Sequence, residues 1–188
     1  MVGYSYGCTV ALQLALDAPE LVRSLALLEP LVPSAPMDAA AQQYFLTALG
    51  TAFARYGAGD RAGAIDAWAG GAFGPDYRRA LEAALPGAFE TAVADADTLF
   101  QVEAATLQQW QLTRDDAARI AAPVLLVRQA DPSWTGFTAT DDLLRSWLLG
   151  ASGFLLPNAT HLLMIAQPRE TAEALADFFA RSARAVPG

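Results

Sequence analysis

The chain has 188 residues, of which 54% are hydrophobic and 17% charged, and its formal net charge is −8 at pH 7. This size and apolarity allow one domain with a sizeable core, or one domain with a large insertion. The net negative charge and the absence of clusters of basic residues argue against a nucleic-acid partner, and no uninterrupted apolar run is long enough to span a membrane.

The single cysteine, Cys8, excludes an internal disulfide framework and a zinc cluster, and we expect no cofactor. Because no basic leader precedes an apolar stretch, we expect a cytoplasmic protein.

The first residues carry a motif that organises the interpretation of the rest. Residues 1–4 predict the end of a strand, and residues 6–18 predict a helix that is apolar on most sides. Between them, Gly3-Tyr4-Ser5-Tyr6-Gly7 matches the G-x-S-x-G pattern of a nucleophile elbow. In such a turn the serine takes a strained backbone angle that exposes its hydroxyl. We expect both flanking glycines to be required, because a Cβ at either position would clash.

A buried strand and a long helical stretch follow the elbow. Residues 24–29 form a short apolar run closed by Pro30, which predicts a buried parallel strand. No strand-like run then appears for some ninety residues. Asp60 is a plausible helix N-cap, and Thr113 with Asp116 resembles a capping box. The sequence predicts helix breaks at Gly70-Gly71 and Gly74-Pro75, among others. The helical periods between the breaks predict helices over 37–56, 60–68, 76–85, 88–111 and 113–120.

Strand character returns in the last third of the chain. Residues 123–128 predict a buried strand and residues 153–156 the next strand, with an amphipathic helix over 140–149 between them and a final helix beginning at Pro168. Strands that alternate with helices predict a parallel sheet. We therefore divide the chain into an α/β core over 1–32 and 122–188, and a helical insertion over 33–121.

Three polar residues fall at the carboxyl ends of predicted strands, where parallel sheets place their reactive groups. These are Ser5, Asp131 and His161. A serine hydroxyl becomes a good nucleophile when a base accepts its proton, and histidine suits that task near neutral pH. A carboxylate then holds the imidazole tautomer and stabilises the imidazolium. Glu29, at the end of the preceding strand, is the main competitor of Asp131 for this role.

The sequence resembles the C-terminal two-thirds of an α/β-hydrolase. Four segments carry the resemblance: Val-Gly-Tyr-Ser-Tyr-Gly at 2–7, Leu-Leu-Glu-Pro at 27–30, Pro-Val-Leu-Leu-Val at 123–127 and Asn-Ala-Thr-His at 158–161. The chain order Ser, Asp, His agrees with that family. The resemblance implies a remnant parallel sheet of about four strands with a helical cap. It also implies Ser5 as nucleophile, His161 as base, Asp131 as acid, with Glu29 as the alternative, and the Tyr6 backbone N–H as an oxyanion donor.

Two classes of function follow from this resemblance. In the first, the chain is a fragment of a serine hydrolase that acts on a small ester, lactone, thioester, amide or C–C bond substrate, with activity reduced or lost. The reason is that the family's early strands and its second oxyanion donor have no counterpart here. In the second, the chain is a non-catalytic binding or interaction module that keeps the elbow as a scaffold. The sequence leaves the substrate and the oligomeric state open.

Overall fold

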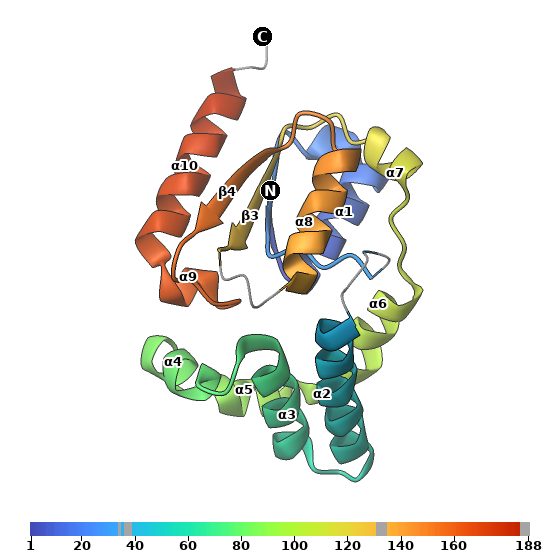
Figure 1. Cartoon of the computed structure of the whole chain (residues 1–188), viewed down its shortest axis with the longest axis vertical. Helices are drawn as coiled ribbons and strands as arrows, with labels where there is room; N and C mark the ends of the chain where they lie inside the picture. The colour runs from blue at the N-terminus through green and yellow to red at the C-terminus, as the bar shows by residue number, and fades with distance from the viewer. Residues whose placement is uncertain (34, 36–38, 131–134, 185–188) are drawn as a thin grey trace.

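In the computed structural model, the described residues are 1–33, 35, 39–130 and 135–184. The strands β1 (Val2–Tyr4), β2 (Leu25–Leu28), β3 (Val124–Gln129) and β4 (Ser152–Leu156) form one parallel sheet in the order β1-β2-β3-β4. The predicted α/β class and four-stranded parallel sheet are therefore confirmed. Since neighbouring strands run parallel, the residues that follow β1, β2 and β3 gather at one edge of the sheet (Figure 1).

Helices cover both faces of the sheet because successive strand residues point to opposite sides. On one face, Leu27 and Leu126 pack in a cluster with residues of α1 (Tyr6–Asp17) and α8 (Thr135–Trp147). On the other face, Leu28 and Val127 pack in a cluster with residues of α9 (Leu163–Ala166) and α10 (Pro168–Arg184). All four residues of β2 are buried, as an interior strand of a parallel sheet requires.

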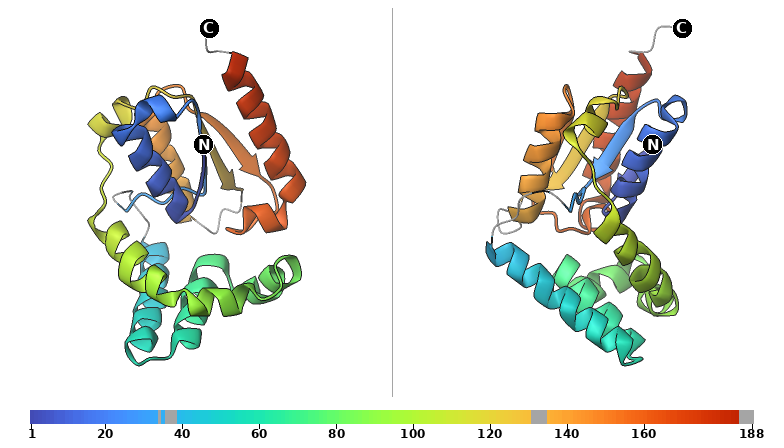
Figure 2. Two further views of the ribbon diagram at one scale, coloured as in Figure 1. Left: turned by 180° about the vertical axis from the view of Figure 1, so that it is seen from behind. Right: turned by 90° about the vertical axis from the view of Figure 1, so that its right-hand side faces the viewer.

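The long stretch between β2 and β3 is helical, as predicted. We call α2 to α6, with the π-helical turn η2 among them, the helical block. It lies at the carboxyl ends of the strands in every view (Figures 1 and 2). Its elements are α2 (Ala39–Gly57), α3 (Arg61–Phe73), α4 (Tyr77–Ala84), α5 (Ala88–Ala94), η2 (Thr98–Glu103) and α6 (Ala104–Gln109).

Two local predictions in the stretch between β2 and β3 are confirmed and one is wrong. Asp60 caps α3 by accepting a hydrogen bond of 2.8 Å from the Gly63 N–H. Thr113 and Asp116 form the reciprocal capping box of α7 (Arg114–Ala118). The predicted break at Gly70-Gly71 does not occur, because α3 continues to Phe73. Gly71 lies directly against the Ala48 side chain of α2, so this glycine permits close helix packing rather than a turn.

The remaining elements extend or add to the predicted ones. A short 3-10 turn, η1 (Pro19–Leu21), joins α1 to β2. Helix α8 begins earlier than its periodicity predicted, and the four-residue α9 was not predicted at all. None of the helices in the described parts of the chain combines the length and apolarity that crossing a bilayer requires.

Candidate active site

Ser5 occupies a sharp turn between β1 and α1. Its backbone has φ 49 and ψ −119, a conformation that is costly for a residue with a side chain. A Cβ at Gly3 would lie 2.6 Å from the Gly7 carbonyl oxygen, so Gly3 is required for the close approach of strand and helix. The same expectation is wrong for Gly7, where an added Cβ would meet no described atom within 4 Å. The strained turn thus depends on one glycine and presents the Ser5 hydroxyl above the sheet edge.

His161 lies beside Ser5, although 156 positions separate them in the chain. The His161 Nε2 is 3.0 Å from the Ser5 Oγ, and the imidazole is 3% exposed. The loop after β4 brings it there, since β4 ends at Leu156. With the proton on Nδ1, the neutral imidazole accepts the hydroxyl hydrogen of Ser5 at Nε2. The structure therefore brings together the two side chains that the sequence predicts as nucleophile and base.

Glu29 supplies the carboxylate that the structure places against the histidine. Its Oε2 is 3.2 Å from the His161 Nδ1, and the residue is fully buried. Its Oε1 accepts a hydrogen bond of 2.5 Å from the backbone N–H of Gln129 at the end of β3. Glu29 has φ 49, a second strained residue at the end of a strand. Strain of about 1–3 kcal/mol persists where surrounding structure fixes the residue, and here backbone and side chain are both held.

The backbone hydrogen bonds of Ser5 and Glu29 continue the hydrogen-bond ladder of the sheet. The Ser5 N–H donates to the Leu28 carbonyl over 2.9 Å, and the Glu29 N–H donates to the Val127 carbonyl over 2.8 Å. Both residues therefore leave their strands while their backbones are still hydrogen-bonded to the neighbouring strand.

Asp131, the acid that the sequence favoured, lies outside the described residues.

Two tyrosines of the elbow take different positions. The Tyr4 hydroxyl donates to the His161 carbonyl over 2.7 Å and so fixes the loop that carries the imidazole. Burial, and secondarily the nearby Glu29, raises the pKa of Tyr4 well above its usual range, so this hydroxyl keeps its proton. Tyr6 is the first residue of α1, where backbone N–H groups have no acceptor within the helix. The Tyr6 N–H therefore has no acceptor within α1, and its role as an oxyanion donor stays a prediction.

Several contacts around the histidine were not expected from the sequence, among them the Tyr4 ring, whose centroid lies 5.3 Å from that of the imidazole. The others are the Tyr4 hydroxyl on the His161 carbonyl, the Gln129 N–H on Glu29, and the Phe73 ring, whose centroid is 5.4 Å from the imidazole centroid. Tyr4 lies inside the elbow motif and could have been considered there. Phe73 belongs to the helical block, and no local signal distinguishes it from the other aromatic residues of that block. Among the described residues, no group of His, Cys, Asp and Glu could hold a metal ion.

Comparison with known families gives a match over most of the chain. The model described as "Alpha/beta hydrolase family" matches residues 1–174. No curated protein matches the chain significantly.

Solved structures resemble the chain over nearly its full length. A bacterial membrane phospholipase A superposes with a TM-score of 0.68 at 21% identity, covering 98% of this chain and 57% of that one. An alpha/beta hydrolase from Sphaerobacter thermophilus gives 0.66 at 24% identity, with 95% and 66% covered. The 2-hydroxy-6-oxo-6-phenylhexa-2,4-dienoate hydrolase of a Rhodococcus species gives 0.65 at 18% identity, with 95% and 63% covered. The chain therefore spans roughly three-fifths of the length of these structures, and at such identities they show the fold alone.

Proposed function

The chain belongs to the alpha/beta hydrolase family, and on that premise we propose that it provides the catalytic triad of a serine hydrolase. Ser5 is the nucleophile, His161 the general base and Glu29 the carboxylate that orients the base. The observation that carries this assignment is the continuous contact from Ser5 Oγ to His161 Nε2 and from His161 Nδ1 to Glu29 Oε2, at 3.0 and 3.2 Å. The substrate is a small molecule with a carbonyl carbon open to attack.

The reaction follows from these contacts. The Ser5 Oγ forms a bond to the substrate carbonyl carbon while its proton passes to His161 Nε2. The carbonyl electron pair moves to oxygen, and the Tyr6 N–H stabilises the resulting oxyanion. Collapse of this intermediate expels the leaving group, which takes the proton from Nε2. Water then attacks the acyl-serine while its proton passes to His161 Nε2, and collapse of the second intermediate returns that proton to the Ser5 Oγ and releases the acid product.

In this reaction Glu29 holds the His161 imidazole in one tautomer. Its carboxylate accepts the Nδ1–H, so Nε2 presents its lone pair to Ser5, and it stabilises the imidazolium formed during each step. Full burial of Glu29 strengthens that interaction, because water does not screen it. The Gln129 N–H fixes the carboxylate from the far side.

We propose that the predicted helical insertion, residues 33–121, acts as a cap over this site and that the helical block, α2 to α6, forms its main part. Its position at the carboxyl ends of the strands supports that role (Figure 1). The bond cleaved remains one of the ester, lactone, thioester, amide or C–C types, and the substrates named for the similar structures are not transferred to this chain.

The test is covalent labelling of the purified protein with a fluorophosphonate probe. We expect labelling of the wild type, and its loss in Ser5→Ala and in His161→Ala. Ser146→Ala is the matched control, since its hydroxyl is exposed on α8 and donates to the Leu143 carbonyl. Labelling that survives Ser5→Ala would remove Ser5 as nucleophile. A wild type that stays unlabelled while circular dichroism shows it folded would favour a non-catalytic binding module.

A further inference from the structure

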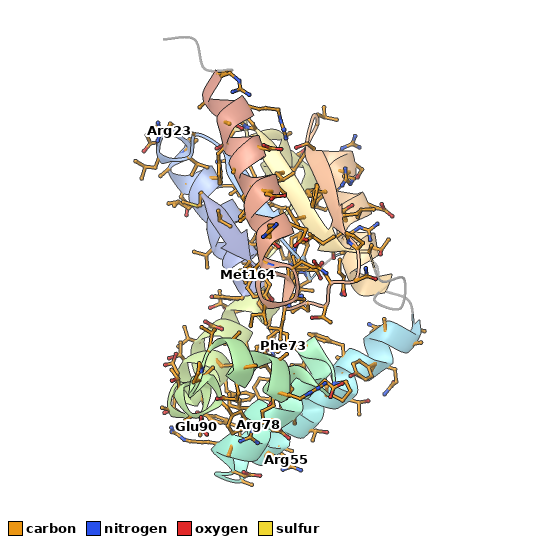
Figure 3. The ribbon with its side chains drawn as sticks, turned by 90° about the vertical axis from the view of Figure 1, so that its left-hand side faces the viewer. Arg23, Arg55, Phe73, Arg78, Glu90 and Met164 are labelled. Carbon is orange, nitrogen blue, oxygen red and sulfur yellow. The ribbon has the colours of Figure 1, made fainter. Side chains whose placement is uncertain are left out.

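We propose that Phe73, the last residue of α3, is a positioning residue for His161 and links the helical block to the base. The inference rests on the proposed function of His161. The Phe73 and His161 rings are stacked, with centroids 5.4 Å apart and planes inclined by 20°. Figure 3 shows Phe73 on the side of the helical block that faces the core, next to the segment carrying Met164.

The stacked contact leaves the chemistry of the imidazole free. Both ring nitrogens point along the ring plane, toward Ser5 and Glu29, and a ring against the face takes neither of them. Rotation about the second side-chain torsion of a histidine is soft, so two hydrogen bonds at 3.0 and 3.2 Å leave room for tilting. An aromatic plane against the face opposes that tilt. The Tyr4 ring also contacts the imidazole, with centroids 5.3 Å apart and planes inclined by 34°. Phe73, whose plane is closer to parallel with the imidazole, therefore restrains from the helical block a tilt that would lengthen both hydrogen bonds.

Phe73 is itself held by aromatic neighbours within the block. The Trp68 ring packs edge-on against it at 5.4 Å, and the Tyr77 ring lies 6.3 Å away. The Tyr77 hydroxyl donates to Asp66 over 2.8 Å, which fixes that ring in turn. The block thus presents Phe73 as part of a packed aromatic group.

The same aromatic residues pack where the helical block meets the sheet core. Tyr77 and Ala69 share a buried cluster with Leu162, the residue after the histidine, and Phe73, Trp68 and Ile165 pack against that cluster. A displacement of α3 would therefore act on the loop of the base as well as on its ring. The position of the block sets the alignment of His161 relative to Ser5.

His161 is the only histidine of the chain, so its imidazole signals in NMR spectra are assigned without ambiguity. We expect one narrow set of signals for the wild type and for Phe73→Tyr, which keeps the aromatic plane. In Phe73→Leu and Phe73→Ala we expect exchange broadening from imidazole motion on the microsecond to millisecond timescale. The rate of fluorophosphonate labelling should fall by about tenfold in Phe73→Leu and up to about a hundredfold in Phe73→Ala, as misplacement of a catalytic group does.

Phe53→Ala is the matched control, because this phenylalanine packs edge-on against Phe100 inside the block. It should lower thermal stability while leaving imidazole line widths and labelling rate near those of the wild type. Narrow signals and wild-type labelling in Phe73→Leu would overturn the proposal, as would an equal loss of labelling in Phe53→Ala. If no protein is labelled but the imidazole broadens only in the Phe73 variants, the positioning stands and the proposed hydrolase function fails. If Phe73→Ala does not fold, the comparison of Phe73→Leu with the wild type and with Phe53→Ala tests the proposal.

Discussion

The sheet core and the helical block use polar residues in different ways. In the core, Glu29 is fully buried between two hydrogen-bond partners, and the Asp141 side chain is 4% exposed beside two arginines. In the block, the Arg61–Asp97 ion pair has side chains 46% and 49% exposed. Ala52 is the one buried residue of α2 in the described chain. The side chains of the proposed triad therefore come from the core, while the block reaches the histidine through the Phe73 ring.

The largest expected effect separates the two candidate acids of the core. Glu29→Gln should lower the rate of ester hydrolysis or of fluorophosphonate labelling by about 10²–10⁴-fold, because the amide no longer stabilises the imidazolium. Asp131→Asn should retain most of the activity. The reverse result, with Asp131→Asn inactive and Glu29→Gln active, would restore the acid that the sequence favoured.

The next effect concerns the buried ion pair of the core. Asp141 lies within α8, 2.6 Å from Arg145 and 3.5 Å from Arg128 of β3. Asp141→Asn should lower the free energy of unfolding by about 3 kcal/mol, because it leaves arginine charge partly buried without its partner. Asp142→Asn, at the exposed neighbouring position, is the control and should stay within about 0.5 kcal/mol of the wild type in urea unfolding. Equal effects of the two variants would contradict the burial argument.

A glycine pair tests packing inside the block. A Cβ at Gly71 would collide with the Ala48 side chain of α2, whereas one at Gly70 would meet no described atom within 4 Å. Gly71→Ala should destabilise the protein by about 1–3 kcal/mol through overpacking. Gly70→Ala should stabilise it by up to about 1 kcal/mol, because alanine favours the helix. Thermal unfolding of both variants measures the difference, and a stabilising Gly71→Ala would refute the close approach of α2 and α3.

The smallest effect is the pH response of the exposed pair in the block. Hydrogen bonds from Tyr56 and then from Arg61 hold the pKa of Asp97 below its usual value. Since the folded pKa is the lower one, Asp97 contributes stability above the unfolded pKa of about 3.9, and this contribution is lost as the pH falls through the folded pKa. Wild type and Asp97→Asn should differ more in urea midpoint at neutral pH than near pH 3. A difference in urea midpoint that is the same at all pH values would show that the ionised carboxylate of Asp97 does not contribute to stability.

Local sequence patterns determined much of this molecule. The alternation of strands and helices, the elbow at Ser5, the caps at Asp60 and Thr113, and the position of His161 after the last strand all depend on residues close together in the chain. Glycine spacing was a poorer guide. The glycine pattern predicts a helix break at Gly71 and a steric need for glycine at Gly7. Both predictions are wrong, because only the packing shows which atoms a Cβ at each glycine would meet.

The tertiary structure decided the partners of the histidine. Glu29 and Asp131 both follow buried strands, so the sequence offers two carboxylates; the structure brings Glu29 against the imidazole, and Asp131 lies outside the described residues. Phe73 reaches the same ring from a helix that precedes β3 and β4 in the chain. Such contacts depend on how layers of the fold meet, and no short stretch of residues encodes them.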